Sequence, residues 1–281
     1  MAILSSHIHL ICRELRDHPV RGTALTLGNL KVVPPLKSVK SILAAYGLRP
    51  PAPLLSDVDM DGATLLKALG AEEVNALDVN AYEGADLIWN LNDPVSPCLH
   101  GHFDFILDGG TLEHVFDLPQ ALDSIARMTK IGGAIVLMTP ASNSVDHGFY
   151  SVSPTLLFDY FGANGFGMLS CYLAELCSYD YSRPVTVYKY PYVSNEYRMS
   201  SDRTLYTIFF ATKLKASQCR HVKPIQSLYT GLHTAVRSGR PAIGPLERRC
   251  RDMIKHWVPW RLVAPVVERR RRSGLQFVGC W

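Results

Sequence analysis

Short apolar runs alternate along the first 215 residues with segments in which apolar side chains recur every three or four positions. The runs predict strands, and the three-to-four spacing predicts amphipathic helices. Strands are predicted at residues 24–33, 74–79, 103–107, 134–138, 169–173 and 204–211, and helices at 38–46, 63–69, 118–129 and 154–161. Such alternation predicts the α/β class with a doubly wound, mostly parallel sheet covered by helices on both faces.

Local signals support several of these boundaries. Asp61 stands where an N-cap would begin the helix at 63–69, and Gly70 follows its end. Pro154 suits the first turn of the helix that it opens. The pair Gly132-Gly133 is expected to end the helix at 118–129 before the next strand begins.

Ligands of open α/β sheets bind beyond the carboxyl ends of the strands. Four residues lie at these strand ends or near them: Gly28, Asp78, Asp108 and Pro140. We therefore expect the functional site at this edge of the sheet.

The net charge of +4 is unevenly distributed. Residues 246–281 hold nine Arg or Lys against three acidic residues, a net charge of +6, which leaves −2 for the rest. A domain that reads nucleic acid carries its positive charge on the folded face, so we expect no nucleic-acid partner. The boundary falls where the composition changes, giving an α/β domain at 1–215 and a basic, partly helical C-terminal extension at 216–281.

The C-terminal extension has two interpretations. Its apolar residues include Trp257 and Trp260 among the cations, a combination that suits a membrane surface or an acidic partner. Prolines at 259 and 265 interrupt any long helix, and a terminal helix that covers the domain is the alternative. The sequence shows neither a secretory leader nor an apolar run of about 18 residues, so we expect a cytoplasmic protein, with peripheral membrane contact through the extension left open.

The seven cysteines are widely spaced and form no C-x-x-C pair. Zinc fingers and disulfide frameworks need closer or paired spacing. We accordingly expect no metal site.

The most informative stretch begins with the strand at 103–107 and continues through Leu112-Glu113-His114-Val115, the helix at 118–129, Gly132-Gly133 and a strand that ends at Pro140. This order resembles the second half of a class I S-adenosylmethionine-dependent methyltransferase of the small-molecule, type 11 kind. The resemblance covers roughly residues 61–213. It implies a Rossmann-like fold, S-adenosylmethionine as cofactor, and methyl transfer to an oxygen or nitrogen atom of a small molecule or glycan precursor.

The resemblance also implies a set of cofactor-binding residues. Asp78 matches the acid that accepts hydrogen bonds from the ribose hydroxyls, and Asn90 or Asn92 falls where a polar side chain faces the adenine edge. The full set is Gly28, Asn29, Asp78, Asn90, Asn92, Asp108 and Gly109. Asp and Asn are also ordinary turn formers, which is the alternative role for Asp78 and the two later asparagines.

The candidate catalytic residues are Glu113, His114, His147 and Tyr150. The resemblance places Glu113 and His114 beside the transferred methyl group, and an imidazole can accept a proton from a hydroxyl or amine near neutral pH. His147 and Tyr150 belong to the loop that related enzymes use over the acceptor. Packing or loop orientation is the alternative for each of them.

The first strand departs from the family pattern. The family expects an acid and several glycines of the type E/D-x-G-x-G-x-G, whereas residues 26–31 contain Gly28 alone and no acid. Glycines allow the backbone to approach the cofactor closely. Either the loop is rebuilt and still binds cofactor, or the chain is a non-catalytic relative that acts as a binding or scaffold protein. A dinucleotide-dependent oxidoreductase ranks last, because its glycine fingerprint is missing.

Overall fold

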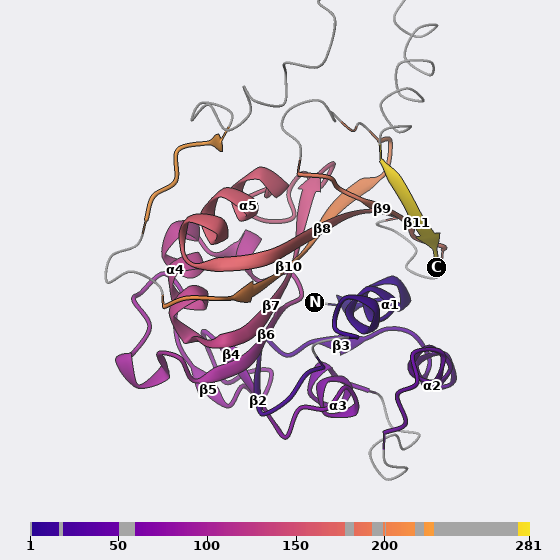
Figure 1. Cartoon of the computed structure of the whole chain (residues 1–281), viewed down its shortest axis with the longest axis horizontal. Coiled ribbons are helices and arrows are strands. Elements are labelled where there is room, and N and C mark those ends of the chain that lie inside the picture. Colours follow the sequence, from indigo (N-terminus) through magenta and orange to yellow (C-terminus); the bar gives the residue numbers. More distant parts are fainter. Residues whose placement is uncertain are drawn as a thin grey trace, which may run out of the picture.

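A nine-stranded sheet runs through the described part of the chain, which comprises residues 2–16, 19–50, 60–177, 183–192, 199, 201–216, 222–227 and 275–281 of a computed structural model (Figure 1). In sheet order the strands are β11 (Gln276–Cys280), β9 (Thr186–Lys189), β8 (Phe166–Leu176), β10 (Thr204–Lys213), β7 (Thr129–Ser142), β6 (Phe103–Asp108), β2 (Thr23–Leu27), β4 (Glu73–Asp78) and β5 (Leu87–Ile88).

Strands β2, β4, β5, β6 and β7 are parallel to one another. Strand β10 pairs antiparallel with both β7 and β8, and β9 and β11 continue the antiparallel part. The carboxyl ends of the parallel strands therefore meet at one edge. The expected α/β, doubly wound, Rossmann-like arrangement is confirmed, with an antiparallel extension on one side.

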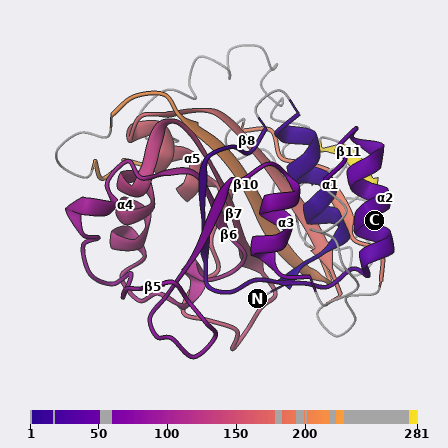
Figure 2. The same ribbon diagram turned by 90° about the horizontal axis from the view of Figure 1, so that it is seen from below.

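Helices cover both faces of the sheet (Figure 2). On one face, α1 (Ser5–Glu14), α2 (Leu36–Ala45) and α3 (Gly62–Ala68) share a buried cluster with Phe105 and Leu107 of β6. On the other, α4 (Leu118–Met128) and α5 (Pro154–Ala163) pack with Phe103 and Ile106 of the same strand. The alternation of side chains along β6 thus gives the molecule two cores.

The cap expected at residue 61 is present. Asp61 accepts a hydrogen bond from the Thr64 N–H at 2.7 Å, which satisfies an otherwise unpaired donor of the first turn of α3. Gly70, with φ of +117°, follows the end of the helix. This element follows from its local sequence alone.

The first predicted strand is two strands. β2 ends at Leu27, and Gly28 takes a φ of +75° while its N–H donates to the Leu77 carbonyl at 2.7 Å. The chain leaves the main sheet at this left-handed glycine. β3 (Lys31–Val32) then pairs in parallel with β1 (Ala2–Ile3) in a separate two-stranded sheet.

The role expected for Gly132-Gly133 is wrong. α4 ends at Met128 and β7 begins directly at Thr129, so both glycines lie inside the strand. Gly132 has a φ of +85°, and a Cβ on Gly133 would lie 3.0 Å from the Asp104 carbonyl oxygen. The glycines serve an irregular stretch of the β6–β7 pairing rather than a helix end.

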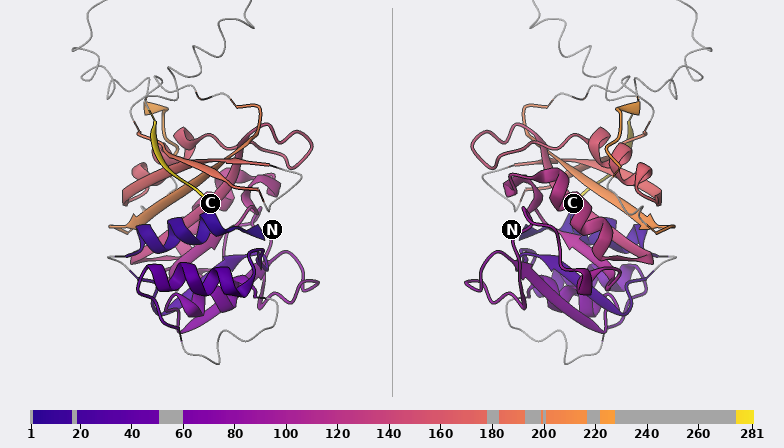
Figure 3. Two further views of the ribbon diagram at one scale, coloured as in Figure 1. Left: turned by 90° about the vertical axis from the view of Figure 1, so that its right-hand side faces the viewer. Right: turned by 90° about the vertical axis from the view of Figure 1, so that its left-hand side faces the viewer.

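Strands β9 and β11 and helix α1 were not expected from the sequence. β11 comes from beyond residue 215 yet pairs with β9, and Figure 3 shows it running toward α1. The Trp281 ring stacks on His9 with ring centroids 5.0 Å apart. Residues 228–274, which include most of the basic extension and its predicted helical part, lie outside the described residues. Among the described helices, none has the length and apolar character that crossing a membrane requires.

Lys213 provides a test of this architecture. Its buried ammonium donates to the Ala126 and Thr129 carbonyls at 2.6 and 2.7 Å, where α4 ends against the sheet. Lys213→Met keeps the aliphatic stem and removes both bonds, so we expect the free energy of unfolding in urea to fall by about 1–3 kcal/mol. The exposed neighbour Lys215 is the control, and Lys215→Met should change it by less than about 0.5 kcal/mol. An equal loss of stability in the two variants would contradict the stabilising role of the Lys213 hydrogen bonds.

Candidate functional site

A cavity of about 670 Å³ lies at the carboxyl-end edge of the sheet. The start of the chain, the segment around β3, the turn after β6 and the loop after β7 all contribute to its wall. The polar residues that line it include His7, Lys31, Glu113, His114, His147 and Tyr206. Three of the four candidate catalytic residues therefore share one cavity.

The turn after β6 positions Glu113 and His114. Asp108 ends the strand, and its carboxylate accepts hydrogen bonds from the N–H groups of Gly110 and Thr111 at 3.1 and 2.7 Å. The Thr111 hydroxyl donates to the Leu27 carbonyl at 2.8 Å, which fixes the turn to β2. The chain then forms the short 3-10 helix η3 (Leu112–His114), which carries both candidates into the cavity wall.

Glu113 is fully buried. Neither of its carboxylate oxygens has a hydrogen-bond partner. Burial, and after it the charge of Asp108, raises the pKa of Glu113 from 4.5 to about 8. Burial also raises the pKa of Asp108, to about 6. Two buried acids that disfavour each other's charge make this wall a place for a proton or a cation.

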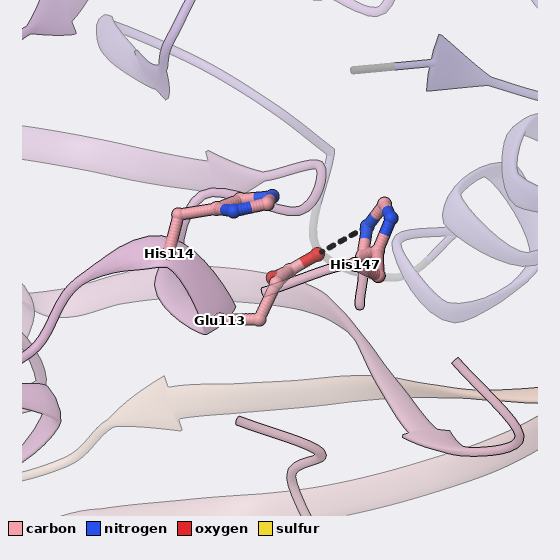
Figure 4. Close-up of side chains that lie close together, drawn as sticks. All are labelled: Glu113, His114 and His147. Carbon is pink, nitrogen blue, oxygen red and sulfur yellow. Dashed lines mark ion pairs between the residues drawn. The ribbon is translucent and has the colours of Figure 1, made fainter. Parts of the chain in front are cut away.

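The loop after β7 is tied to Glu113 through its backbone. The N–H groups of Phe149 and Tyr150 both donate to the Glu113 carbonyl, at 2.8 and 3.2 Å. A Cβ on Gly148 would lie 2.8 Å from that same oxygen, so only glycine permits the approach. The result is that His147 faces the Glu113 carboxylate, with 3.5 Å between Nε2 and Oε1 (Figure 4).

The two imidazoles lie side by side at the opening of the cavity, with ring centroids 5.2 Å apart. Burial, and then the neighbouring His147, lowers the pKa of His114 below 6.5. This environment favours the neutral form of His114, which has a nitrogen lone pair available. Figure 4 shows both rings and the Glu113 carboxylate directed into one small space.

His7 is a cavity residue that was missed in the sequence. Its Nδ1 accepts a hydrogen bond from the Leu4 N–H at 3.2 Å, so the proton of the neutral ring belongs on Nε2. Burial lowers the pKa of His7 to about 4, and Nε2 has no hydrogen-bond partner. A histidine on the apolar face formed by Ile8, Leu10 and Ile11 was the available signal.

Tyr150 lies elsewhere. Its hydroxyl donates to the Phe116 carbonyl at 2.7 Å, and its side chain lines a different cavity of about 760 Å³ with residues of α4 and α5. The backbone of Tyr150 holds the loop, while its side chain faces away from Glu113. A catalytic role for Tyr150 has no support in this arrangement.

The residues predicted to bind the cofactor do not all lie at the cavity. Asp78 ends β4 and accepts from the N–H groups of Val79 and Asn80 at 2.6 and 3.4 Å, leaving its carboxylate partly exposed. Asn29 donates to the Glu83 carbonyl at 2.9 Å. These bonds leave Asp78 at the same edge as the cavity but outside its wall.

Asn90 and Asn92 form a local turn. The Asn90 side chain accepts from both the N–H and the side-chain amide of Asn92, at 3.0 and 2.9 Å. Asn92 in turn accepts from the Asp117 N–H at 2.8 Å, just before α4. These contacts are those of turn-forming residues, which was the alternative role for both asparagines. Contact with adenine stays a prediction.

The Leu30 side chain fills space beside the backbone that the family pattern leaves open with glycines. It is 1% exposed and packs in space between Gly62 and Gly109. A Cβ on Gly62 would be 2.8 Å from the Leu30 Cβ, and a Cβ on Gly109 would be 2.8 Å from its Cδ2. Gly109 thus serves close packing with Leu30, a contact that the sequence does not reveal.

Residues 66–137 match the model of a family described as a methyltransferase domain. Among solved structures, the YcgJ protein from Bacillus subtilis is 11% identical, with 75% of this chain and 100% of that chain covered and a TM-score of 0.43. A SAM-dependent methyltransferase from Archaeoglobus fulgidus is 13% identical, with 73% and 94% covered and a TM-score of 0.38. A search of curated proteins finds no match.

Residues 66–137 thus match a methyltransferase domain, and the strand order of the described residues is that of the class I, S-adenosylmethionine-dependent methyltransferase fold. The residues present fit that cofactor at two places. Asp78 has a partly exposed carboxylate of the kind that ribose hydroxyls would bind, and the Glu113 carboxylate, which has no hydrogen-bond partner, faces the cavity in which a cationic ligand would be stabilised.

The raised pKa of Glu113 has a consequence for stability. Between pH 4.5 and about 8 the unfolded chain releases a proton that the folded protein keeps, so stability falls as pH rises through this range. Glu113→Gln removes this titration. In EDTA, so that no cation compensates the charge, we expect the variant to melt at least about 3 °C above the wild type at pH 8. The difference in melting temperature between the variant and the wild type should become smaller toward pH 5.

The matched control is Glu72→Gln, which changes an exposed acid at the opposite end of β4 from Asp78. Its melting temperature should follow that of the wild type at both pH values. A Glu113→Gln variant that is less stable than the wild type at pH 8 would mean that the carboxylate has a partner in the folded protein.

Proposed function

We propose that this protein transfers the methyl group of S-adenosylmethionine to an oxygen or nitrogen atom of a small acceptor, a small molecule or glycan precursor, bound in the 670 Å³ cavity. The observation that carries the proposal is the Glu113 carboxylate. It is buried in the wall with both oxygens unpaired, and a positively charged ligand is what such a group stabilises.

S-adenosylmethionine supplies an electrophilic methyl group on a positively charged sulfur. Asp78 would accept hydrogen bonds from its ribose hydroxyls with the oxygen lone pairs that Val79 and Asn80 leave available. Glu113 would lower the energy of positive charge in the cavity, and the turn at Gly110 keeps that carboxylate in place. Holding the acceptor in line with the methyl group then provides most of the rate.

The acceptor atom must lose a proton as it gains the methyl group. His147 is placed to take that proton, because it is exposed at the cavity and is oriented by Glu113 at 3.5 Å. His7 would donate its unpaired Nε2–H to a second polar atom of the acceptor. Leu4, Met138 and Leu176 supply apolar wall, and the volume lies in the range of small-molecule sites.

A specific observation favours a second candidate. Leu30 packs against Gly109 where the family pattern leaves backbone free for the cofactor. A non-catalytic methyltransferase-like protein, acting as a binding or scaffold protein, would tolerate this packing. Its expected basic membrane- or partner-binding segment lies mainly at 228–274, outside the described residues, and stays a prediction.

Calorimetric titration with S-adenosylmethionine and S-adenosylhomocysteine separates these candidates. We expect saturable binding that Asp78→Ala weakens by tenfold or more, about 1.4 kcal/mol. Glu72→Gln, just before the other end of the same strand, should leave the affinity unchanged. Folded protein that binds neither compound would favour the non-catalytic candidate.

Transfer itself is measured with tritiated S-adenosylmethionine against a panel of phenols, amines and sugars. On any acceptor that is labelled, His147→Ala should slow the transfer by about 100-fold, because a general base contributes at least that much, while cofactor affinity is retained. The control is His102→Ala, an exposed histidine just before the opposite end of β6. An unchanged rate of transfer in His147→Ala would contradict the role of His147 as the general base.

A further inference from the structure

Three side chains at the cavity bring metal-binding atoms together. One carboxylate oxygen of Glu113 and one ring nitrogen each of His114 and His147 lie within 4.8 Å of one another. The two imidazoles are exposed and the carboxylate is buried beneath them. Figure 4 shows the three groups converging from η3 and from the loop after β7.

We propose that Glu113, His114 and His147 bind a divalent transition-metal ion at the opening of the cavity. Two imidazoles with one carboxylate form the ligand set of catalytic zinc sites and of non-haem iron sites, and this set leaves coordination positions open. Magnesium and calcium prefer oxygen ligands alone, so the two nitrogens select a transition metal.

The buried carboxylate is an independent observation for a cation here. Both Glu113 oxygens lack a hydrogen-bond partner, and the side chain is fully buried against the cavity. The 3.5 Å separation from His147 is an ion pair only when that ring is protonated. A metal ion would satisfy the carboxylate and use the neutral form of both rings.

The ligands are held in advance by contacts of the backbone. The Phe149 and Tyr150 N–H groups bind the Glu113 carbonyl, and Gly148 allows that approach, so the loop that carries His147 is fixed to η3. A zinc ion with bonds of 2.0–2.1 Å needs its ligand atoms about 3.3 Å apart. Rotation of the two exposed rings would bring the atoms from within 4.8 Å to that spacing.

The consequence for the reaction rests on the proposed function. A metal ion occupies the lone pairs of both rings, so His147 no longer accepts the proton of the acceptor. Instead, a hydroxyl bound at an open position gives its proton to solvent water, because the ion lowers the pKa of a bound oxygen group, and the metal-bound form thereby replaces His147 as the means of deprotonation. The site would thereby favour hydroxyl acceptors over amines.

The test is a titration of the full-length protein, dialysed against EDTA and then freed of it, with CoCl₂ followed by visible absorption and with ZnCl₂ followed by calorimetry. We expect one equivalent of either ion to bind, with cobalt bands of a four- or five-coordinate site and no thiolate-to-cobalt charge-transfer band. His147→Ala and Glu113→Gln should each weaken binding by tenfold or more, whereas His102→Ala should not.

Circular dichroism confirms that each variant is folded, and exposed His147 can be replaced with little structural cost. The proposal is overturned by an absence of saturable binding, by a thiolate band that assigns the ion to cysteines, or by affinity that His147→Ala and Glu113→Gln leave unchanged. The titration contains no S-adenosylmethionine, so its failure leaves methyl transfer standing, and a failure of cofactor binding leaves the metal site standing.

Discussion

The site depends on a carboxylate that is buried without a hydrogen-bond partner. Glu113 lies under the cavity wall, close enough to Asp108 for each acid to disfavour the charge of the other. An unpaired buried charge is costly, so the carboxylate either holds a proton or binds a cation. The proposed cofactor, a protonated histidine and a metal ion would each supply the positive charge that the ionised carboxylate needs. In each case the site would select its ligand mainly by positive charge.

The fold keeps Glu113 in this position from two directions. Asp108 shapes the turn after β6 through the N–H groups of Gly110 and Thr111, and the loop after β7 binds the Glu113 carbonyl through two further N–H groups. The bonds from the loop after β7 are backbone bonds, whereas the turn after β6 depends on the Asp108 carboxylate. Chemical specificity is left to the groups that face the cavity, above all His7, His114 and His147.

Local patterns predicted the helix capped by Asp61 and the strands that end at Asp78 and Asp108, because each depends on its own periodicity and cap. The sequence identified Glu113, His114 and His147 as candidates, but it did not show that they lie close together. Their proximity depends on hydrogen bonds from the loop after β7 to the Glu113 backbone carbonyl, which no sequence pattern indicates. His7 and Leu30 reach the site only because β1 pairs with β3, a contact between distant residues. The edge strand β11 likewise depends on its pairing with β9, which is distant in sequence.

The most direct measurement is a carbon-13 NMR titration of the Glu113 carboxyl, assigned through Glu113→Gln, in EDTA with and without ligand. In the free protein we expect a pKa well above 4.5, toward about 8. S-adenosylmethionine should lower this pKa more than S-adenosylhomocysteine, which lacks the positive charge on sulfur. An ordinary pKa near 4.5 that neither compound alters would contradict the central role of this carboxylate.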